Sequence, residues 1–551
     1  MADSLASGIA VPHILIPDEK VNMKKWSVVA CDQFVYDQSY WDSVDRLVGN
    51  APSTLRMMLP EAYLGEDDVT ERIEDTKDAM YDYIEAGVLK ELPAGFMLVE
   101  RFIKGRPRLG LMVLLDLEQY EFEPGLRPLI RPTEQTIKNR IPPRMQIRMG
   151  APVEMPHILA LIDDPGCTVI EPVYDVRSRF KKLYDFELMQ NGGRITGYFV
   201  DDQACIDGVM NALEALPTHD GMKIAVGDGN HSLATAKEVW NRAKQVLSEE
   251  EIEQSPLRYA LCELINLNDP ALDIEPIHRA ITGINPSSCI QYIVDKLNQK
   301  RLGAKLIFSR KKRFPSWGDA SDNSRTIYFS SKESNGRIEL TNLSHVMMLE
   351  DLQPVLEQLV SEMSTARLEY IHGNDKIADM AGNYDTLCFT LPAIKKDEFM
   401  DTIVNCGVLP KKCFSLGEEN EKRYYLESRL LIIPEDDAPA QEESAVTDEE
   451  IYTEEETPDA DAADEPGCKH ADPSSMNEEF SEELAFHEPI QVITSEEHFE
   501  ELPGDAAVLE EIETEGEVCR KKVKSYRDDL DDLVDDGACG ADSDPSAIIE
   551  D

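Results

Sequence analysis

The stretch with the clearest chemical potential is KIAVGDGNHSLATAKEVW, residues 223–240. An apolar run typical of a strand leads into the turn 227–229. A helix should begin at Asn230 or His231, because Asn is a favoured N-cap. The first N–H groups of a helix have no partner within it, and the helix dipole places partial positive charge there. A strand, a glycine turn and a helix N-terminus in this order predict an anion site, and we expect a phosphate.

Each residue type in this turn can serve a bound phosphate. Gly227 and Gly229 would let the backbone approach the phosphate closely, because neither carries a side chain. Asp228 would repel a phosphate unless a cation such as Mg²⁺ bridged them, so it is a candidate metal ligand or general base. His231 can donate to a phosphoryl oxygen or move a proton near neutral pH. The alternative is a structural turn in which Asp228 and Asn230 merely satisfy backbone donors.

The segment IRPTEQTIKNRIPPRMQIR is unusually cationic for so acidic a chain. A local basic patch is what a phosphorylated ligand requires, although an exposed helix or loop face would have the same composition. Its arginines are Arg131, Arg140, Arg144 and Arg148. We assign Arg144 and Arg148 to nucleotide binding.

Further candidates are isolated polar residues in mostly apolar segments. His278 and Arg279 in EPIHR, and Arg56 in STLRMMLP, are assigned to the substrate, through a phosphate or carboxylate. Asp32 and Gln33 in ACDQF are weaker candidates on the same grounds. The alternative for His278 is a structural role, which is more common for a lone histidine among strand-like residues.

Apolar runs of strand length alternate with amphipathic stretches of helical spacing up to about residue 434, which predicts an α/β or α+β fold. The expected strands are 27–30, 96–102, 109–117, 157–162, 195–200, 223–226, 259–265, 304–308, 326–329 and 385–391. The expected helices are 67–88, 174–190, 202–215, 231–246, 287–299, 349–363 and 396–406. The glycine turn therefore falls at a junction between a strand and a helix.

We expect three parts in the chain. Residues 1–284 form an N-terminal catalytic domain that carries the DGNH phosphate loop, and a break near GINP precedes a new helix. Residues 285–434 form a second α/β lobe. Residues 435–551 form an acidic tail with 41 Asp and Glu against 6 Lys and Arg, which holds 35 of the chain's 52 net negative charges. Such a composition predicts disorder.

The charge of the chain limits its partners. Non-specific binding of DNA or RNA depends on Lys and Arg to neutralise phosphates, so a net charge of −52 argues against nucleic acid. The tail is a candidate for recruiting a protein partner. The alternative is that it only keeps the protein soluble. No apolar stretch is long enough to cross a membrane, and the start of the chain lacks a signal-peptide pattern. We therefore expect a cytoplasmic protein.

The loop VGDGNHSLATAK resembles the D-G-H-H-R signature of domain-of-unknown-function family 1015, whose members resemble the SerK free-serine kinases of the ParB/sulfiredoxin-like superfamily. Other segments match that family in pattern and order, so the resemblance spans about residues 10–433. They are VVACDQFVYDQSYW, PSTLRMMLPEAYL, RPRLGLMVLLDLEQYEFEPGLRPLIRPTEQT, HILALIDDP, EPIHR and VLPKKCFSLGEENEKRYYLESR.

The resemblance implies a ParB/sulfiredoxin-like catalytic core that transfers a phosphoryl group from a nucleotide with Mg²⁺, either ATP or ADP, to the hydroxyl of free L-serine. Asp228, Gly229 and His231 match the signature. Asn230 replaces its first His and Ser232 replaces its Arg, and we assign both to nucleotide binding. The replaced Arg would have offered a bidentate phosphate contact that Ser cannot offer.

A second matching pattern lies in RPTEQT. Glu134 and Thr136 fit the H-E-x-T pattern of the family, whose His is Thr133 here. A carboxylate in such a segment beside a phosphate loop is the natural candidate to accept the proton of the substrate hydroxyl. Without the resemblance, Glu134 would read as a surface charge in a proline-bounded loop.

We predict a small-molecule kinase that acts on an amino-acid hydroxyl, with Glu134, Asp228 and His231 as catalytic residues. One alternative is a nucleotide-binding switch or scaffold of the ParB-like type without kinase activity. Another is a phosphatase or nucleotidase that uses water as the acceptor in the same pocket. The sequence has neither a P-loop nor the protein-kinase motifs, so those kinase folds are poor candidates.

Overall fold

The computed structural model describes residues 7–432, except for 36, 124 and 310–324. These residues belong to one compact unit. Strands and helices are mixed throughout it, so the predicted α/β class is confirmed. The acidic tail 435–551 lies outside the described residues, and its disorder and its protein partner stay predictions.

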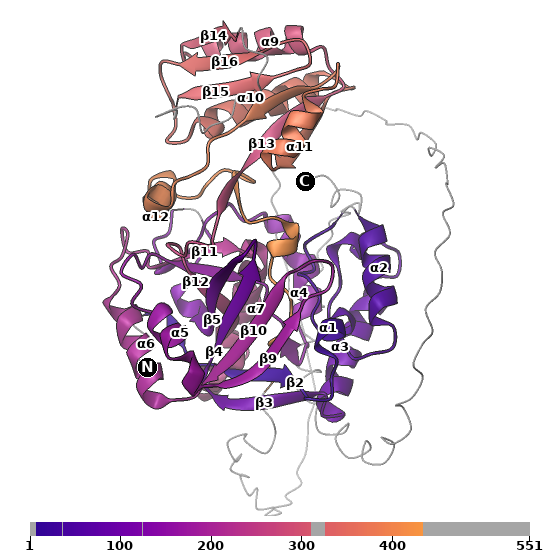
Figure 1. The fold of residues 1–551 in the computed structure, drawn as a ribbon, viewed down its shortest axis with the longest axis vertical. Helices are drawn as coiled ribbons and strands as arrows, with labels where there is room; N and C mark the ends of the chain where they lie inside the picture. Colours follow the sequence, from indigo (N-terminus) through magenta and orange to yellow (C-terminus); the bar gives the residue numbers. More distant parts are fainter. Residues whose placement is uncertain (1–6, 36, 124, 310–324, 433–551) are drawn as a thin grey trace, which may run out of the picture. The chain divides into compact units, whose positions relative to one another are not determined.

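The larger sheet has nine strands and contains the predicted phosphate loop (Figure 1). Its order is β6-β11-β8-β12-β5-β4-β10-β9, and β1 pairs with β5. Most pairs are antiparallel, but β11 runs parallel to β6 and β12 runs parallel to β8. The strands are β1 Ile9–Ala10, β4 Phe96–Ile103, β5 Arg106–Asp116, β6 Ile130–Pro132, β8 Leu159–Ile162, β9 Lys181–Glu187, β10 Arg194–Val200, β11 Ile224–Asp228 and β12 Tyr259–Asn266.

The central strands β4, β8 and β12 of this sheet are buried on both faces, which explains why they read as continuous apolar runs. In β4, Phe96 lies in one hydrophobic core together with helix α7 (Asn230–Ala243). Its neighbour Met97 lies in another core together with the N-terminal segment around Trp26. Successive side chains of a strand point to opposite faces, so one apolar run serves two cores.

A second sheet of seven strands is built from residues 274–416. Its order is β14-β16-β15-β18-β13-β17, and β19 pairs with β13. Strand β13 starts this sheet before residue 284, and the division of the chain at that residue stays a prediction. The strands are β13 Ile274–Thr282, β14 Ala304–Phe308, β15 Thr326–Ser330, β16 Asn335–Leu340, β17 Arg367–His372, β18 Leu387–Thr390 and β19 Phe414–Leu416.

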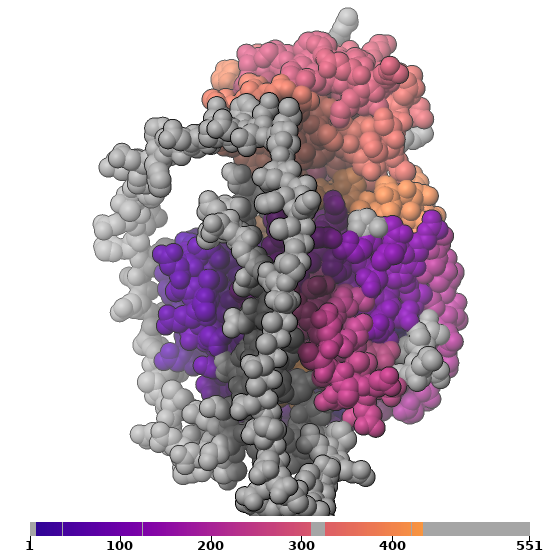
Figure 2. Space-filling model, turned by 180° about the vertical axis from the view of Figure 1, so that it is seen from behind, coloured from indigo at the N-terminus to yellow at the C-terminus, as the bar shows by residue number. Residues whose placement is uncertain are grey.

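The last described segment returns from the second sheet to the first part of the chain. Strand β20 (Arg429–Leu430) pairs with β7 (Val153–Glu154), and Ser27 Oγ donates to the carbonyl of Tyr425 over 2.8 Å. In the space-filling view of Figure 2, orange residues near the end of the described chain lie next to purple residues from its first part. This return brings Lys422 to the loop that precedes α7.

Twelve α-helices lie in the described residues, and six of the seven predicted helices are among them. No helix in this part of the chain is long and apolar enough to cross a membrane. A further two-stranded sheet joins β2 (His13–Pro17) and β3 (Leu89–Ala94). The helices are α1 Met23–Trp26, α2 Gln38–Val48, α3 Val69–Glu85, α4 Ile141–Arg148, α5 Glu171–Asp175, α6 Gln203–Ala215, α7 Asn230–Ala243, α8 Glu249–Gln254, α9 Pro286–Gln299, α10 Met348–Glu362, α11 Asn374–Met380 and α12 Lys396–Cys406.

Two local predictions are wrong. Residues 174–190 were expected to form one helix, but residues 181–187 of this segment form the strand β9, which pairs antiparallel with β10. Pairing with a neighbouring strand outweighed a helix-like spacing of its apolar residues. Residues 27–30, expected as a strand, form a single bridge from Val29 to Tyr424 among the described residues.

Candidate functional site

The predicted anion site lies at the junction of β11 and α7. Gly229 takes the N-cap position of α7 with a φ of +77°. A left-handed φ is unfavourable for residues with a Cβ, and a Cβ at this position would lie 3.0 Å from Ile158 Cα. No side chain of the described residues caps this helix end. The N–H groups of its first turn can therefore serve a ligand.

The sequence favoured Asn230 as the N-cap of α7. In the structure Asn230 is the first residue of the helix, and Gly229 is the N-cap. The Asn230 side chain bonds Thr133 instead: Oδ1 accepts from Thr133 N over 3.3 Å, and Nδ2 donates to Thr133 Oγ1 over 3.2 Å. Thr133 Oγ1 in turn donates to the carbonyl of Val226 over 2.7 Å. These bonds join the ends of β6 and β11, and they place Glu134 beside the loop.

A cavity of about 570 Å³ opens at the N-terminus of α7. Seven of the predicted site residues line it together: Glu134, Arg144, Asp228, Gly229, Asn230, His231 and Ser232. The weaker candidate Asp32 lines it as well, and so does Arg140 of the cationic segment. So do Glu61, His157 and Lys412, for which the sequence predicted no role, although each lies in or next to a segment that matches the family.

Glu134 is half-buried and forms a parallel bridge to Leu409 directly after β6. Burial raises the pKa of its carboxyl to about 7, with the N–H groups of Lys412 and Cys413 opposing the rise and the Asp228 carboxylate adding to it. A general base works best when its pKa lies near the operating pH. The Glu134 carboxyl can therefore take up and release a proton near neutral pH.

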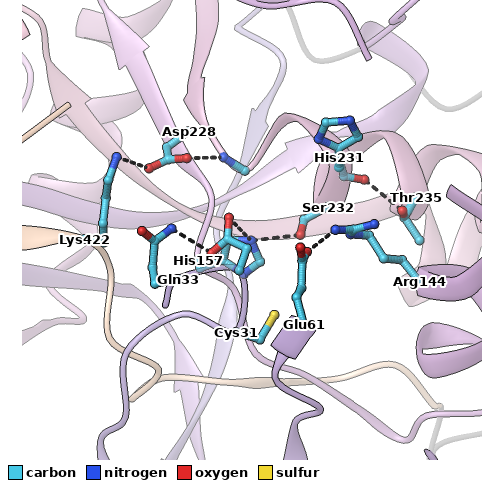
Figure 3. A network of polar contacts seen from close by, with 12 residues as sticks. Cys31, Gln33, Glu61, Arg144, His157, Asp228, His231, Ser232, Thr235 and Lys422 are labelled. Atoms are coloured by element: carbon cyan, nitrogen blue, oxygen red, sulfur yellow. Dashed lines mark hydrogen bonds and ion pairs between the residues drawn. The ribbon is translucent and has the colours of Figure 1, made fainter. Parts of the chain in front are cut away.

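Asp228 is bound from two sides (Figure 3). Its Oδ1 accepts from Gly229 N over 2.9 Å, and its Oδ2 accepts from Lys422 Nζ over 2.9 Å. Lys422 Nζ also donates to Ser415 Oγ over 3.0 Å. Burial acts to raise the pKa of Asp228, but the Lys422 ammonium outweighs it and holds the pKa below its usual value. Asp228 is therefore ionised at neutral pH, with Lys422 balancing its charge.

His231 is held as a neutral imidazole. Burial, followed by the charges of Arg144, Arg140 and Lys411, lowers its pKa to about 3. Its Nε2 accepts a hydrogen bond from Ile137 N over 3.1 Å, so the ring proton resides on Nδ1. This arrangement suits donation from Nδ1 to a phosphoryl oxygen, and it opposes the predicted transfer of a proton near neutral pH.

The Ser232 hydroxyl lies against a histidine from a distant segment (Figure 3). Ser232 Oγ is 3.0 Å from His157 Nε2, and His157 Nδ1 is 2.8 Å from the Tyr425 hydroxyl. Asp32 Oδ2 lies 3.8 Å from the same Nε2. Sequence reasoning placed Ser232 in the loop, but no local pattern could have identified its partner.

The two arginines assigned to the nucleotide are both paired with carboxylates. Arg144 pairs with Glu61 and faces the cavity. Arg148 pairs with Glu154 over 2.6 Å and lines an adjoining apolar chamber of about 140 Å³. Glu154 also pairs with Arg429 over 2.7 Å. Arg148 is thus part of an ion-pair network, whereas Arg144 lines the cavity.

Gly227 and Arg56 are not among the residues that line the cavity. A Cβ on Gly227 would lie 2.6 Å from a side-chain carbon of Leu416, so this glycine serves close packing within the fold. Arg56 is exposed and pairs with Asp45 over 2.7 Å. Neither position brings the residue to the predicted phosphate.

His278 and Arg279 are buried in β13 and are not among the cavity-lining residues either. His278 Nδ1 accepts from Leu391 N over 3.1 Å, and Nε2 lies 3.1 Å from Asn374 Oδ1. Arg279 Nε donates to Gln353 Oε1 over 2.8 Å. Their polar atoms form hydrogen bonds within the second sheet and its helices, so both residues have a structural role there.

Comparison with known proteins gives one family and several solved structures. A conserved hypothetical protein from Pyrococcus furiosus is 12% identical, with 57% of this chain and 90% of that chain covered and a TM-score of 0.29. A free serine kinase in complex with AMP is also 12% identical. The match covers 57% of this chain and 87% of the kinase chain, with a TM-score of 0.30. A variant free serine kinase in complex with ADP is 14% identical over the same shares, with a TM-score of 0.31.

These structural similarities are too low to assign an activity. No curated protein sequence matches the chain. The family model described as "Protein of unknown function (DUF1015)" matches residues 15–359, which is more than half of the chain. The chain therefore belongs to the DUF1015 family.

Proposed function

We propose that this protein is a cytoplasmic, nucleotide-dependent kinase that transfers a phosphoryl group to the hydroxyl of a free amino acid. The observation that carries the proposal is the meeting of two features in one cavity. The uncapped first turn of α7 lies there, and so does Glu134, whose pKa is about 7. Phosphoryl transfer requires held phosphates and a residue that orients the attacking hydroxyl.

The donor phosphates would lie against the first turn of α7. The N–H groups of Asn230, His231 and Ser232 supply donors there, and His231 Nδ1 supplies another. Arg144 and Arg140 line the same cavity and add positive charge. Glu134 would accept the proton of the acceptor hydroxyl. The choice of L-serine as the first acceptor rests on the resemblance of the family to free-serine kinases.

Mg²⁺ would accompany the nucleotide and would not be held by the protein alone. In the described part of the chain, no cluster of three or more His, Cys, Asp or Glu could hold a metal ion. Asp228 already bonds Gly229 and Lys422, but each carboxylate oxygen keeps a second lone pair. Kinase Mg²⁺ is commonly bound by one or two carboxylates together with substrate phosphates. Asp228 fits that role as one ligand, and the ion would supply charge neutralisation at the phosphates.

Incubation with nucleotide labelled in its terminal phosphate, with and without L-serine, tests the proposal. Serine-dependent formation of labelled O-phosphoserine is the expected result. Label released as phosphate without serine would instead indicate a phosphatase or nucleotidase. Binding without turnover would indicate a nucleotide-binding switch. Both ATP and ADP are tested as donors.

A matched pair of variants ties the activity to the cavity. Asp228→Asn keeps the size of the side chain and removes its charge, so it should weaken Mg²⁺-dependent activity. Asp45→Asn removes a carboxylate that pairs with Arg56 on the surface and should leave activity unchanged. Equal activity of both variants, with the metal dependence of the wild type, would contradict the assignment of Asp228.

A further inference from the structure

Ser232 occupies an unusual place for a serine hydroxyl. It is the third residue of α7, and it is half-buried where the polar cavity meets the apolar chamber. Its Oγ is 3.0 Å from Nε2 of the buried His157. A serine within hydrogen-bond reach of a histidine that is itself oriented by a third group has the geometry of an activated nucleophile.

The bonds around His157 are compatible with a ring proton on Nδ1. The Tyr425 hydroxyl accepts from Cys31 N over 3.3 Å and donates its single hydrogen to Cys31 Sγ over 3.1 Å. Its remaining lone pair can then accept a hydrogen bond from His157 Nδ1, 2.8 Å away. With the proton on Nδ1, the lone pair of Nε2 faces Ser232 Oγ. This is the tautomer that a general base requires.

Two carboxylates lie near the pair. Asp32 Oδ2 lies 3.8 Å from His157 Nε2, and Asp228 interacts electrostatically with the same ring. The serine oxygen lies in the first turn of α7, where the helix dipole stabilises developing negative charge.

We propose that Ser232 is a nucleophile that takes the phosphoryl group from the donor nucleotide and passes it to the acceptor. In the first step, Ser232 Oγ bonds to the terminal phosphorus, the bond from phosphorus to the leaving nucleotide breaks, and the hydroxyl proton moves to His157 Nε2. In the second step, the acceptor oxygen bonds to phosphorus, the Oγ–P bond breaks, and His157 returns its proton to Oγ. Glu134 takes the acceptor proton and releases it to solvent. This step rests on the proposed function, because it needs a nucleotide bound at α7.

Acid-quenched mass measurement of the full chain tests this inference. The protein is incubated with Mg²⁺ and either ATP or ADP, without acceptor, and the phosphorylated residue is then mapped. The wild type should gain the mass of one phosphoryl group, located on Ser232. Glu134→Gln should slow the second step, so that the phosphoenzyme persists after acceptor is added. His157→Gln should slow labelling by about 10² to 10⁴ without changing nucleotide affinity.

Two serine variants provide the contrast. Ser232→Ala should abolish the label. Ser288 is the third residue of α9, and its Oγ bonds Asn285, so Ser288→Ala should label as the wild type does. A measurement on the wild type alone does not depend on the folding of variants: without acceptor, labelled leaving nucleotide should exchange into the donor.

The possible failures can be told apart. Nucleotide binding without label on Ser232, or without exchange, overturns this inference and leaves the proposed kinase intact. Label on another residue overturns it as well. Absence of any nucleotide binding overturns the proposed function and this inference together.

Discussion

Replacing Glu134 with Gln tests the chemistry and the electrostatics of the site in one variant. Gln keeps the shape of the side chain and an oxygen that can accept from the N–H groups of Lys412 and Cys413, but it cannot ionise. Loss of a positioned general base should lower kcat by about 10² to 10⁴. The Kd of the nucleotide should not change, because the first turn of α7 would hold the phosphates.

The same substitution should change stability with a definite sign. Burial raises the pKa of Glu134 from 4.5 to about 7, so the folded protein binds this proton more tightly than the unfolded chain does. Stability therefore falls as the pH rises between those two values. Above pH 7, the ionised carboxylate lowers the free energy of unfolding by at most about 3–4 kcal/mol, at about 1.4 kcal/mol per pH unit. Glu134→Gln removes this penalty, so the variant should be the more stable protein at pH 8.

Urea unfolding at pH 5 and pH 8 measures the stability difference, which should be much smaller at pH 5. Profiles of kcat/KM against pH measure the chemistry, and the wild-type rate should fall as the pH drops below about 7 and Glu134 takes up a proton. The control is Glu123→Gln, an exposed carboxyl paired with Lys138, which should leave kcat unchanged. A Glu134→Gln variant with full kcat would remove this residue from the mechanism. A variant less stable than the wild type at pH 8 would refute the raised pKa.

Three further perturbations have defined outcomes. Lys422→Met deprives Asp228 of its cation and should lower the free energy of unfolding by about 1–3 kcal/mol at pH 7. This loss of stability should shrink near pH 4, because the carboxylate can take up a proton there. Equal losses at the two pH values, measured by urea unfolding, would contradict this. Gly227→Ala places a Cβ 2.6 Å from a leucine side chain and should lower the free energy of unfolding by about 1–3 kcal/mol. The control Gly208→Ala, at an open position in α6, should be neutral or stabilising by up to about 1 kcal/mol. Similar melting temperatures of the two variants would refute the packing argument. Truncation after Pro434 should leave Tm and turnover unchanged, and a fall in either would show that the acidic tail acts on the folded part.

Local patterns in the sequence were sufficient for the fold class and for the loop at the centre of the site. The apolar run 223–226 and the helical spacing after Asn230 predicted β11 and α7 with nearly correct bounds. Such signals depend on periodicity along the chain, which a single sequence displays directly. The acidic composition of residues 435–551 is likewise a property of the sequence alone.

The sequence was less informative wherever a residue's role depended on its partner. His278 and Arg279 resemble ligand contacts in EPIHR, but both are buried and bonded within the second sheet and its helices. Asn230 resembles an N-cap, but its amide bonds Thr133 and Gly229 takes the cap. Residue type alone does not distinguish a binding group from one whose bonds are already satisfied.

The tertiary structure alone decided the electrostatics and the pairing of the site. Lys422 meets Asp228, and His157 meets Ser232, across long stretches of chain. The pKa of Glu134 is set by burial among backbone groups of another segment. Contacts between distant segments and the desolvation that they cause leave no periodic signal in a sequence. The sequence therefore determined which residues could perform the chemistry, and the fold determined their partners and their charge.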